Sequence, residues 1–207
     1  MPRCRALHAC LATVPAALLA LASAPALAHH PTGGETPETV LSGLLSGLGH
    51  PVLGLDHLAM LVGVGLIAAR HARGALLPAL FVVAMAAGAL LHLGGVTLPL
   101  AEPLVAGTVI AAGAAAALAL TLPLGALAAL FGLAGLAHGH ALAESIVGAE
   151  AGPLLAYLAG LVIVQAGIAT GVLLLARRVA ASRPATFAPR LAGLAVALVG
   201  VVALATA

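Results

Sequence analysis

The sequence has very few charged residues and no lysine at all. Charged side chains make up 7% of its 207 residues, whereas hydrophobic residues make up 63%. A soluble domain carries roughly a quarter charged residues, so this composition excludes an ordinary soluble protein and indicates an integral membrane protein. The net charge of +2 provides no basic surface, and we therefore expect no nucleic acid partner.

Aromatic residues are equally scarce. Tryptophan is absent and the aromatic residues together make up 2% of the chain, whereas transmembrane β-barrels carry girdles of aromatic side chains at both interfaces. The chain is instead rich in Ala, Leu and Gly, and small residues let membrane helices pack closely. The composition therefore predicts an all-α, polytopic helix bundle in the lipid bilayer.

Cysteine is limited to Cys4 and Cys10, and both lie in a segment with the pattern of a secretory signal peptide. The segment has a positively charged start, an apolar core and a small-residue cleavage site at Ala26-Leu27-Ala28. We expect residues 1–28 to be removed and residues 29–207 to form a single transmembrane domain without disulfide bonds. An uncleaved first helix is the alternative interpretation.

Six apolar stretches follow the signal, and a bilayer core needs about 20 apolar residues per helix. The predicted spans are Leu53–Ala69, Ala75–Leu93, Leu104–Leu120, Leu124–Leu142, Leu154–Ala176 and Leu191–Ala205. A Gly-rich segment, Glu38–Gly49, comes first and is too short to span. With Pro51 behind it, this segment is predicted to be a short broken or re-entrant helix that brings His50 to the mouth of the bundle, as broken helices do at transporter sites.

The charged residues predict an orientation. All arginines beyond the signal fall in the loops after the first and fifth spans: Arg70, Arg73, Arg177, Arg178, Arg183 and Arg190. Because cytoplasmic loops are enriched in arginine, we predict a multi-pass protein of the bacterial inner membrane with a periplasmic mature N-terminus. All six acids then lie at or near the outer side: Glu35, Glu38, Asp56, Glu102, Glu144 and Glu150.

Ionisable residues gather at the outer ends of three predicted spans, although charge is costly in a membrane and by default indicates function. They are His50, Asp56 and His57 at the first span, Glu102 at the third, and His138, His140 and Glu144 at the fourth. Imidazole and carboxylate groups bind borderline divalent metals. We predict one shared metal site; independent structural roles are the alternative, and for Glu102 a favourable helix dipole is an equal explanation.

Helical spacing predicts how some of these side chains point. His50 and His57 are two turns apart and share a face if the helix is continuous. His140 and Glu144 are four residues apart and also share a face. His138 points away from His140 on an ideal helix, unless Gly139 loosens the turn.

Several other polar residues have open roles. His92 either joins the site or caps its helix, and His29 and His30 either bind metal at the mature N-terminus or are incidental. Gln165 and Thr170 lie inside the fifth span, where they either bond a neighbouring helix or line a path.

The motifs His50-x5-Asp56-His57 and His138-Gly139-His140-x3-Glu144 together resemble the HupE/UreJ family of nickel permeases, which are linked to hydrogenase or urease maturation. Further matches are Gly54 in the first motif, Met60 and Gly63 after it, and Leu98-Pro99-x2-Glu102. The resemblance covers the mature chain. Two departures are Leu142 and Ala143, which replace a histidine and a glycine, and a third is the lack of a histidine after Ala169-Thr170.

The resemblance implies secondary import of Ni²⁺, or of Co²⁺, with seven residues needed for transport: His50, Asp56, His57, Glu102, His138, His140 and Glu144. Zn²⁺ accepts the same ligands. We predict no enzyme activity, no resident cofactor and, without a nucleotide-binding motif, no ATP use by this chain alone. The alternatives are an intramembrane metalloenzyme and a non-transporting metal-binding accessory protein.

Overall fold

The computed structural model describes residues 36–182 and 187–207, and this part of the chain is helical with no strand. Its seven α-helices are α2 (Val40–Leu53), α3 (Leu55–Ala68), α4 (Leu76–Leu93), α5 (Ala101–Ala117), α6 (Leu124–Ala143), α7 (Ala151–Ser182) and α8 (Ala188–Thr206), with a short 3-10 turn, η2 (Glu144–Ile146), after α6. The predicted signal peptide, His29, His30, Glu35 and Arg183 lie outside the described residues.

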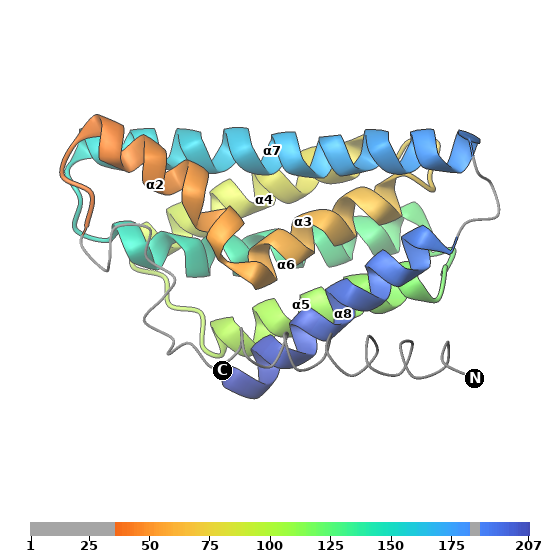
Figure 1. The fold of residues 1–207 in the computed structure, drawn as a ribbon. Coiled ribbons are helices and arrows are strands. Elements are labelled where there is room, and N and C mark those ends of the chain that lie inside the picture. Colours follow the sequence, from red (N-terminus) through yellow and green to blue (C-terminus); the bar gives the residue numbers. More distant parts are fainter. Residues whose placement is uncertain (1–35, 183–186) are drawn as a thin grey trace, which may run out of the picture.

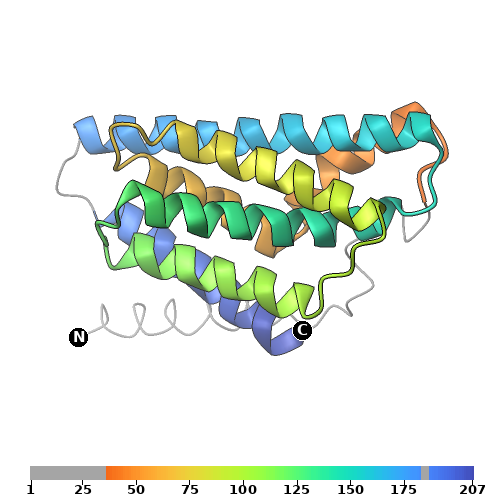
Figure 2. The ribbon, with the colours of Figure 1, turned by 180° about the vertical axis from the view of Figure 1, so that it is seen from behind.

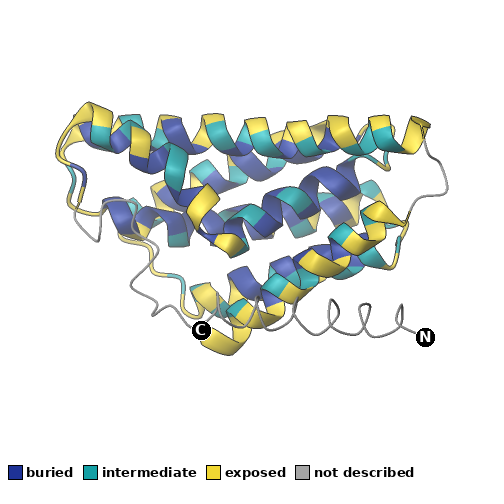
Figure 3. Cartoon of the chain, viewed as in Figure 1, coloured by how far each residue is buried: buried dark blue, intermediate teal, exposed yellow. Residues whose placement is uncertain are grey.

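The helices pack side by side as an elongated bundle (Figures 1 and 2). α4 packs along α6, α5 along α8, and α2 along the first part of α7. α3 lies in the centre, where it contacts α5, α7 and α8. Ten of its fourteen residues are buried, which explains why α3 is almost entirely apolar after His57. The dark blue core in Figure 3 follows this central helix, while exposed residues cover the outer faces of α7 and α8.

Four helices are long and apolar enough to cross a membrane: α4, α6, α7 and α8. The bent pair α2–α3 makes a fifth if its two halves form one span, and α5 is apolar but only 17 residues long, or about 26 Å. The prediction of an all-helical bundle with several candidate membrane spans is confirmed. Six spans remain a prediction.

The predicted short helix before the first span is present, but it ends later than Pro51 indicated. α2 continues through Pro51 to Leu53, and the break falls at Gly54, where α2 and α3 meet at 74°. The Gly54 amide closes α2 by donating to the His50 carbonyl at 2.9 Å. A Cβ at Gly54 would lie 2.8 Å from Cδ2 of His57, so a larger residue at the bend would have to displace the His57 ring.

Charged residues of opposite sign lie at opposite ends of the bundle. At one end, Arg70 donates to the Ala119 carbonyl and Arg177 donates to the His71 carbonyl. At the other end, Glu38 and Glu150 line an open pocket of about 660 Å³. These positions agree with the charge asymmetry of the sequence, because the arginine loops share one end and Glu38 and Glu150 lie at the other.

Candidate metal site

A buried histidine pair joins α3 to α6. His57 is 8% exposed and His138 1% exposed, and their Nδ1 atoms are 2.8 Å apart. Thr108 of α5 donates its hydroxyl proton to the Val105 carbonyl at 2.7 Å, so at 3.2 Å it accepts from Nε2–H of His138. His138 Nδ1 is then the acceptor and His57 Nδ1–H the donor. The lone pair of the His57 ring is therefore on Nε2, the atom through which this ring can bind a metal.

The His50 ring is held by a second network, which connects α2, η2 and α7. Its Nδ1 lies 3.1 Å from Ser145 Oγ and 3.0 Å from the Tyr157 hydroxyl. That hydroxyl donates to the Leu142 carbonyl at 2.6 Å, so it can accept from Nδ1–H of His50. The lone pair of His50 is then on Nε2. The His50 and His57 ring centroids are 6.1 Å apart, edge to face.

The networks around His50 and His57 have the form of outer contacts to metal-binding histidines. A ligating imidazole almost always donates its other N–H to a fixed acceptor, which sets the tautomer and the ring orientation. Here Tyr157 and Ser145 contact Nδ1 of His50. His138 contacts Nδ1 of His57 and is itself held by Thr108. The arrangement therefore presents two oriented imidazoles at the bend between α2 and α3.

Substituting Tyr157 by phenylalanine is expected to weaken metal binding about 10- to 100-fold, the usual cost of losing such an outer contact. Only the hydroxyl is removed, so the ring still fills its fully buried position. Equilibrium binding of Ni²⁺ to the purified protein measures the effect. Thr206→Val is the control, since among the described residues that hydroxyl bonds only carbonyls of its own helix. Equal affinity in both variants would contradict the expectation.

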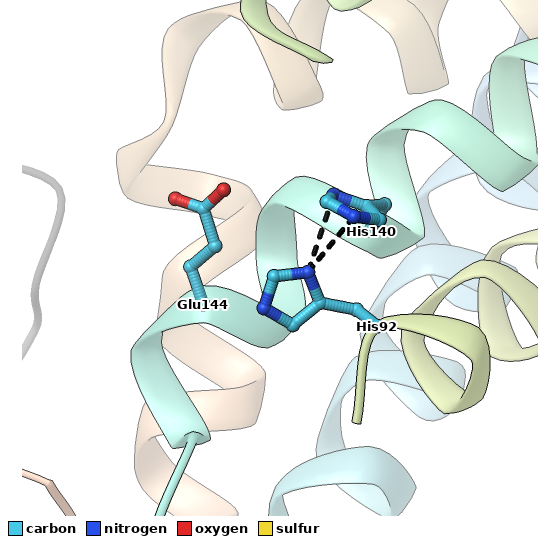
Figure 4. Close-up of side chains that lie close together, drawn as sticks. All are labelled: His92, His140 and Glu144. Carbon is cyan, nitrogen blue, oxygen red and sulfur yellow. Dashed lines mark hydrogen bonds between the residues drawn. The ribbon is translucent and has the colours of Figure 1, made fainter. Parts of the chain in front are cut away.

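A second group lies on the other side of α6 and is shown in Figure 4. His92 comes from the end of α4, His140 from the last turn of α6, and Glu144 from η2. One ligand atom from each of the three lies within 4.8 Å of the others, the one such group among the described residues. Ligand nitrogens about 2.1 Å from an ion are at most about 4.2 Å apart, so an inward movement that also releases His140 Nε2 from the Leu98 amide would let all three coordinate one metal.

The exposure of this triad changes from one residue to the next. Glu144 is exposed, His92 half-buried and His140 only 6% exposed. His140 Nε2 accepts from the Leu98 amide at 2.9 Å and lies 3.1 Å from the Val96 carbonyl, so the loop between α4 and α5 closes over this ring. The exposure of the triad therefore falls from Glu144 through His92 to His140.

The structure divides the predicted shared site into two groups. His138 contacts His57 on one face of α6, and His140 contacts His92 on another, as the two-residue spacing on a regular helix predicts. Gly139 does not loosen the turn. It lies against the Met85 backbone of α4, where a Cβ would collide with the carbonyl oxygen. His92, whose role the sequence left open, joins the second group.

The two remaining carboxylates lie in the first turns of their helices. Asp56 is half-buried, and its Oδ1 accepts from the His57 amide at 2.8 Å. Glu102 is exposed in the first turn of α5 and is outside the triad. Asp56 therefore lies directly beside the buried pair, and Glu102 lies in a first turn, where the helix dipole favours a carboxylate.

Three side chains of the site were missed by the sequence analysis: Thr108, Ser145 and Tyr157. His50 pairs with residues 95 and 107 positions away, and no local pattern connects such distant positions. Tyr157 did carry a signal, because it is the only tyrosine in the chain and a buried tyrosine hydroxyl usually finds a polar partner.

The fold and the site define a multi-pass helical membrane protein with clustered histidines suited to a divalent metal. The chain belongs to the HupE/UreJ family. The model of this family, described as HupE / UreJ protein, matches residues 17–203. That family is associated with nickel and cobalt handling rather than with an enzyme activity.

A similar curated protein is Protein HupE of Rhizobium leguminosarum bv. viciae, which is 36% identical over 124 residues. The match covers 59% of this chain and 62% of that protein, so the chain spans less than two thirds of the relative's length. No solved structure matches this chain.

Proposed function

We propose that this protein is a secondary permease that imports Ni²⁺, or Co²⁺, across the bacterial inner membrane. The observation that carries the proposal is the convergence of His92, His140 and Glu144 within 4.8 Å in a bundle of apolar helices. Borderline divalent ions accept these nitrogen and oxygen ligands. Family membership supports the choice of nickel and a role in supplying the maturation of a nickel enzyme.

The two histidine groups suggest two steps of transport. Glu144 is exposed and attracts the hydrated ion, and His92 and His140 replace part of its water. His50 and His57 then receive the ion deeper in the bundle, where His138 orients the His57 ring and the Asp56 carboxylate offsets charge. Glu102 belongs to the proposed set through its match to the family motif and acts at the outer entrance.

The membrane potential can drive the inward step without nucleotide hydrolysis. Moving one charge across the membrane releases about 2.3 kcal/mol per 100 mV, and a divalent ion therefore gains about twice that amount. The arginine loops around Arg70 and Arg177 share one end of the bundle. The positive-inside rule supports a cytoplasmic location for this end, and we propose that the triad and the mature N-terminus are periplasmic.

The test is uptake of radioactive Ni²⁺ by vesicles that contain the purified protein. We expect time-dependent accumulation that increases with an inside-negative potential. Competing Co²⁺ should reduce this accumulation more than Zn²⁺ at the same concentration. Empty vesicles are the control. Tight, stoichiometric Ni²⁺ binding with no accumulation would contradict transport and leave a metal-binding accessory role or a metalloenzyme.

A further inference from the structure

Gln165 of α7 is a buried polar residue that neither histidine group uses. It is 2% exposed, and its amide nitrogen has no hydrogen-bond partner within the described part of the chain. A polar side chain inside a membrane helix usually bonds a neighbouring helix. An unsatisfied donor in this environment costs free energy, because neither lipid nor bulk water can replace the missing partner.

The place of Gln165 connects it with the histidine groups. The buried stripe of α7 repeats every four residues through Tyr157, Leu161, Gln165, Ala169 and Leu173. Gln165 therefore faces the bundle, as does Tyr157, which holds His50, and the two side chains point about 80° apart around the helix axis. Eight residues correspond to about 12 Å along a helix, so Gln165 lies about 12 Å further inward, close to the middle of the 32-residue helix.

Gln165 also lies between the two zones in which α7 meets the broken helix. A Cβ at Gly160 would lie 2.9 Å from the Leu48 nitrogen of α2, and a Cβ at Gly65 of α3 would lie 2.8 Å from the Ala169 carbonyl. Between these two zones the partner of α7 changes from α2 to α3, because α2 and α3 are bent by 74° relative to each other. Gln165 is the polar residue of the α7 stripe in the interval between them.

We propose that Gln165 is a binding position for the partly hydrated divalent cation on its way inward from the histidine groups. This inference rests on the proposed transport function and adds a residue outside the family motifs. The amide oxygen can accept from a metal-bound water or bind the ion, and the amide N–H can donate to a second water. A neutral amide holds a divalent ion weakly, which suits a position from which the ion must leave.

The experiment compares Gln165→Leu with Thr170→Val in vesicle uptake of ⁶³Ni²⁺. Thr170 is the matched control, because it lies on the same helix but on an exposed face. We expect Gln165→Leu to reduce the initial uptake rate at least tenfold and Thr170→Val to leave it unchanged. Equilibrium ⁶³Ni²⁺ binding and the thermal unfolding midpoint are measured on both variants in detergent. For Gln165→Leu we expect wild-type affinity and an equal or higher midpoint.

Three outcomes would overturn the assignment of Gln165. Wild-type uptake in Gln165→Leu would make the residue a structural glutamine only, and so would a lowered unfolding midpoint or a loss of equilibrium Ni²⁺ binding. Each of these leaves the transport proposal intact if wild-type vesicles accumulate Ni²⁺. Absence of uptake by the wild-type protein is a separate result, which would contradict the transport function itself.

Discussion

Replacing His57 by alanine is expected to abolish Ni²⁺ uptake while the protein still reaches the membrane. The substitution removes one imidazole of the buried pair and leaves His138 without its 2.8 Å partner. Loss of an outer contact to a ligand already costs 10- to 100-fold in affinity, so we expect loss of the ligand to reduce uptake at least about 100-fold. The measurement is vesicle uptake of radioactive Ni²⁺, normalised to the protein present.

His71→Ala is the control for this substitution, because it removes an imidazole from the loop at the arginine end of the bundle. Asp56→Asn is a second test, since it removes the charge beside the pair but keeps an oxygen that can accept from the His57 amide. We expect His71→Ala to transport normally and Asp56→Asn to be inactive. Normal transport by both His57→Ala and Asp56→Asn would contradict the central role of the motif.

The helices were largely predictable because membrane solubility requires long apolar runs. α4 begins and ends within one residue of the predicted span Ala75–Leu93, and α6 within one residue of Leu124–Leu142. The opposed directions of His138 and His140 followed from helical spacing alone. Helix bounds and side-chain directions depend on hydrophobicity and helical spacing within a single segment, so they can be predicted without knowing how the helices pack.

The bend in the first span was placed wrongly because two helix-disturbing residues are close together. Proline removes one N–H, but neighbouring helices can compensate inside a membrane, and α2 continues through Pro51. The break falls instead at Gly54, which is the C-cap of α2 and the N-cap of α3. Both Pro51 and Gly54 are compatible with a break, and the sequence pattern does not distinguish between them.

The partners of the histidines were unpredictable because they depend on tertiary packing, which the sequence pattern does not contain. Tyr157 reaches His50 only because α2 lies directly against the first part of α7, where a Cβ at Gly47 would collide with the Tyr157 carbonyl. The pairing of His92 with His140 depends in the same way on the close packing of α4 and α6. Close helix contacts at small residues thus decide which ionisable groups meet.

The substitution Gly139→Ala tests this dependence of the site on helix packing. A Cβ at position 139 would collide with the Met85 carbonyl and lie 2.9 Å from the Ala89 nitrogen. Both are backbone atoms of α4 and cannot rotate away, so α4 and α6 must separate. Overpacking costs typically 1–3 kcal/mol, and we expect the free energy of unfolding to fall by about 3 kcal/mol. Separation would also move His92 away from His140, so Ni²⁺ uptake should be lost.

Gly132→Ala is the matched control on the same helix. A Cβ at Gly132 would meet no atom within 4 Å among the described residues, and alanine favours a helix interior over glycine by about 1 kcal/mol. This variant should therefore unfold at an equal or higher temperature and retain wild-type uptake. If Gly139→Ala behaves like Gly132→Ala in both measurements, the triad does not depend on close contact between α4 and α6. The pairing of His92 with His140 would then need another cause.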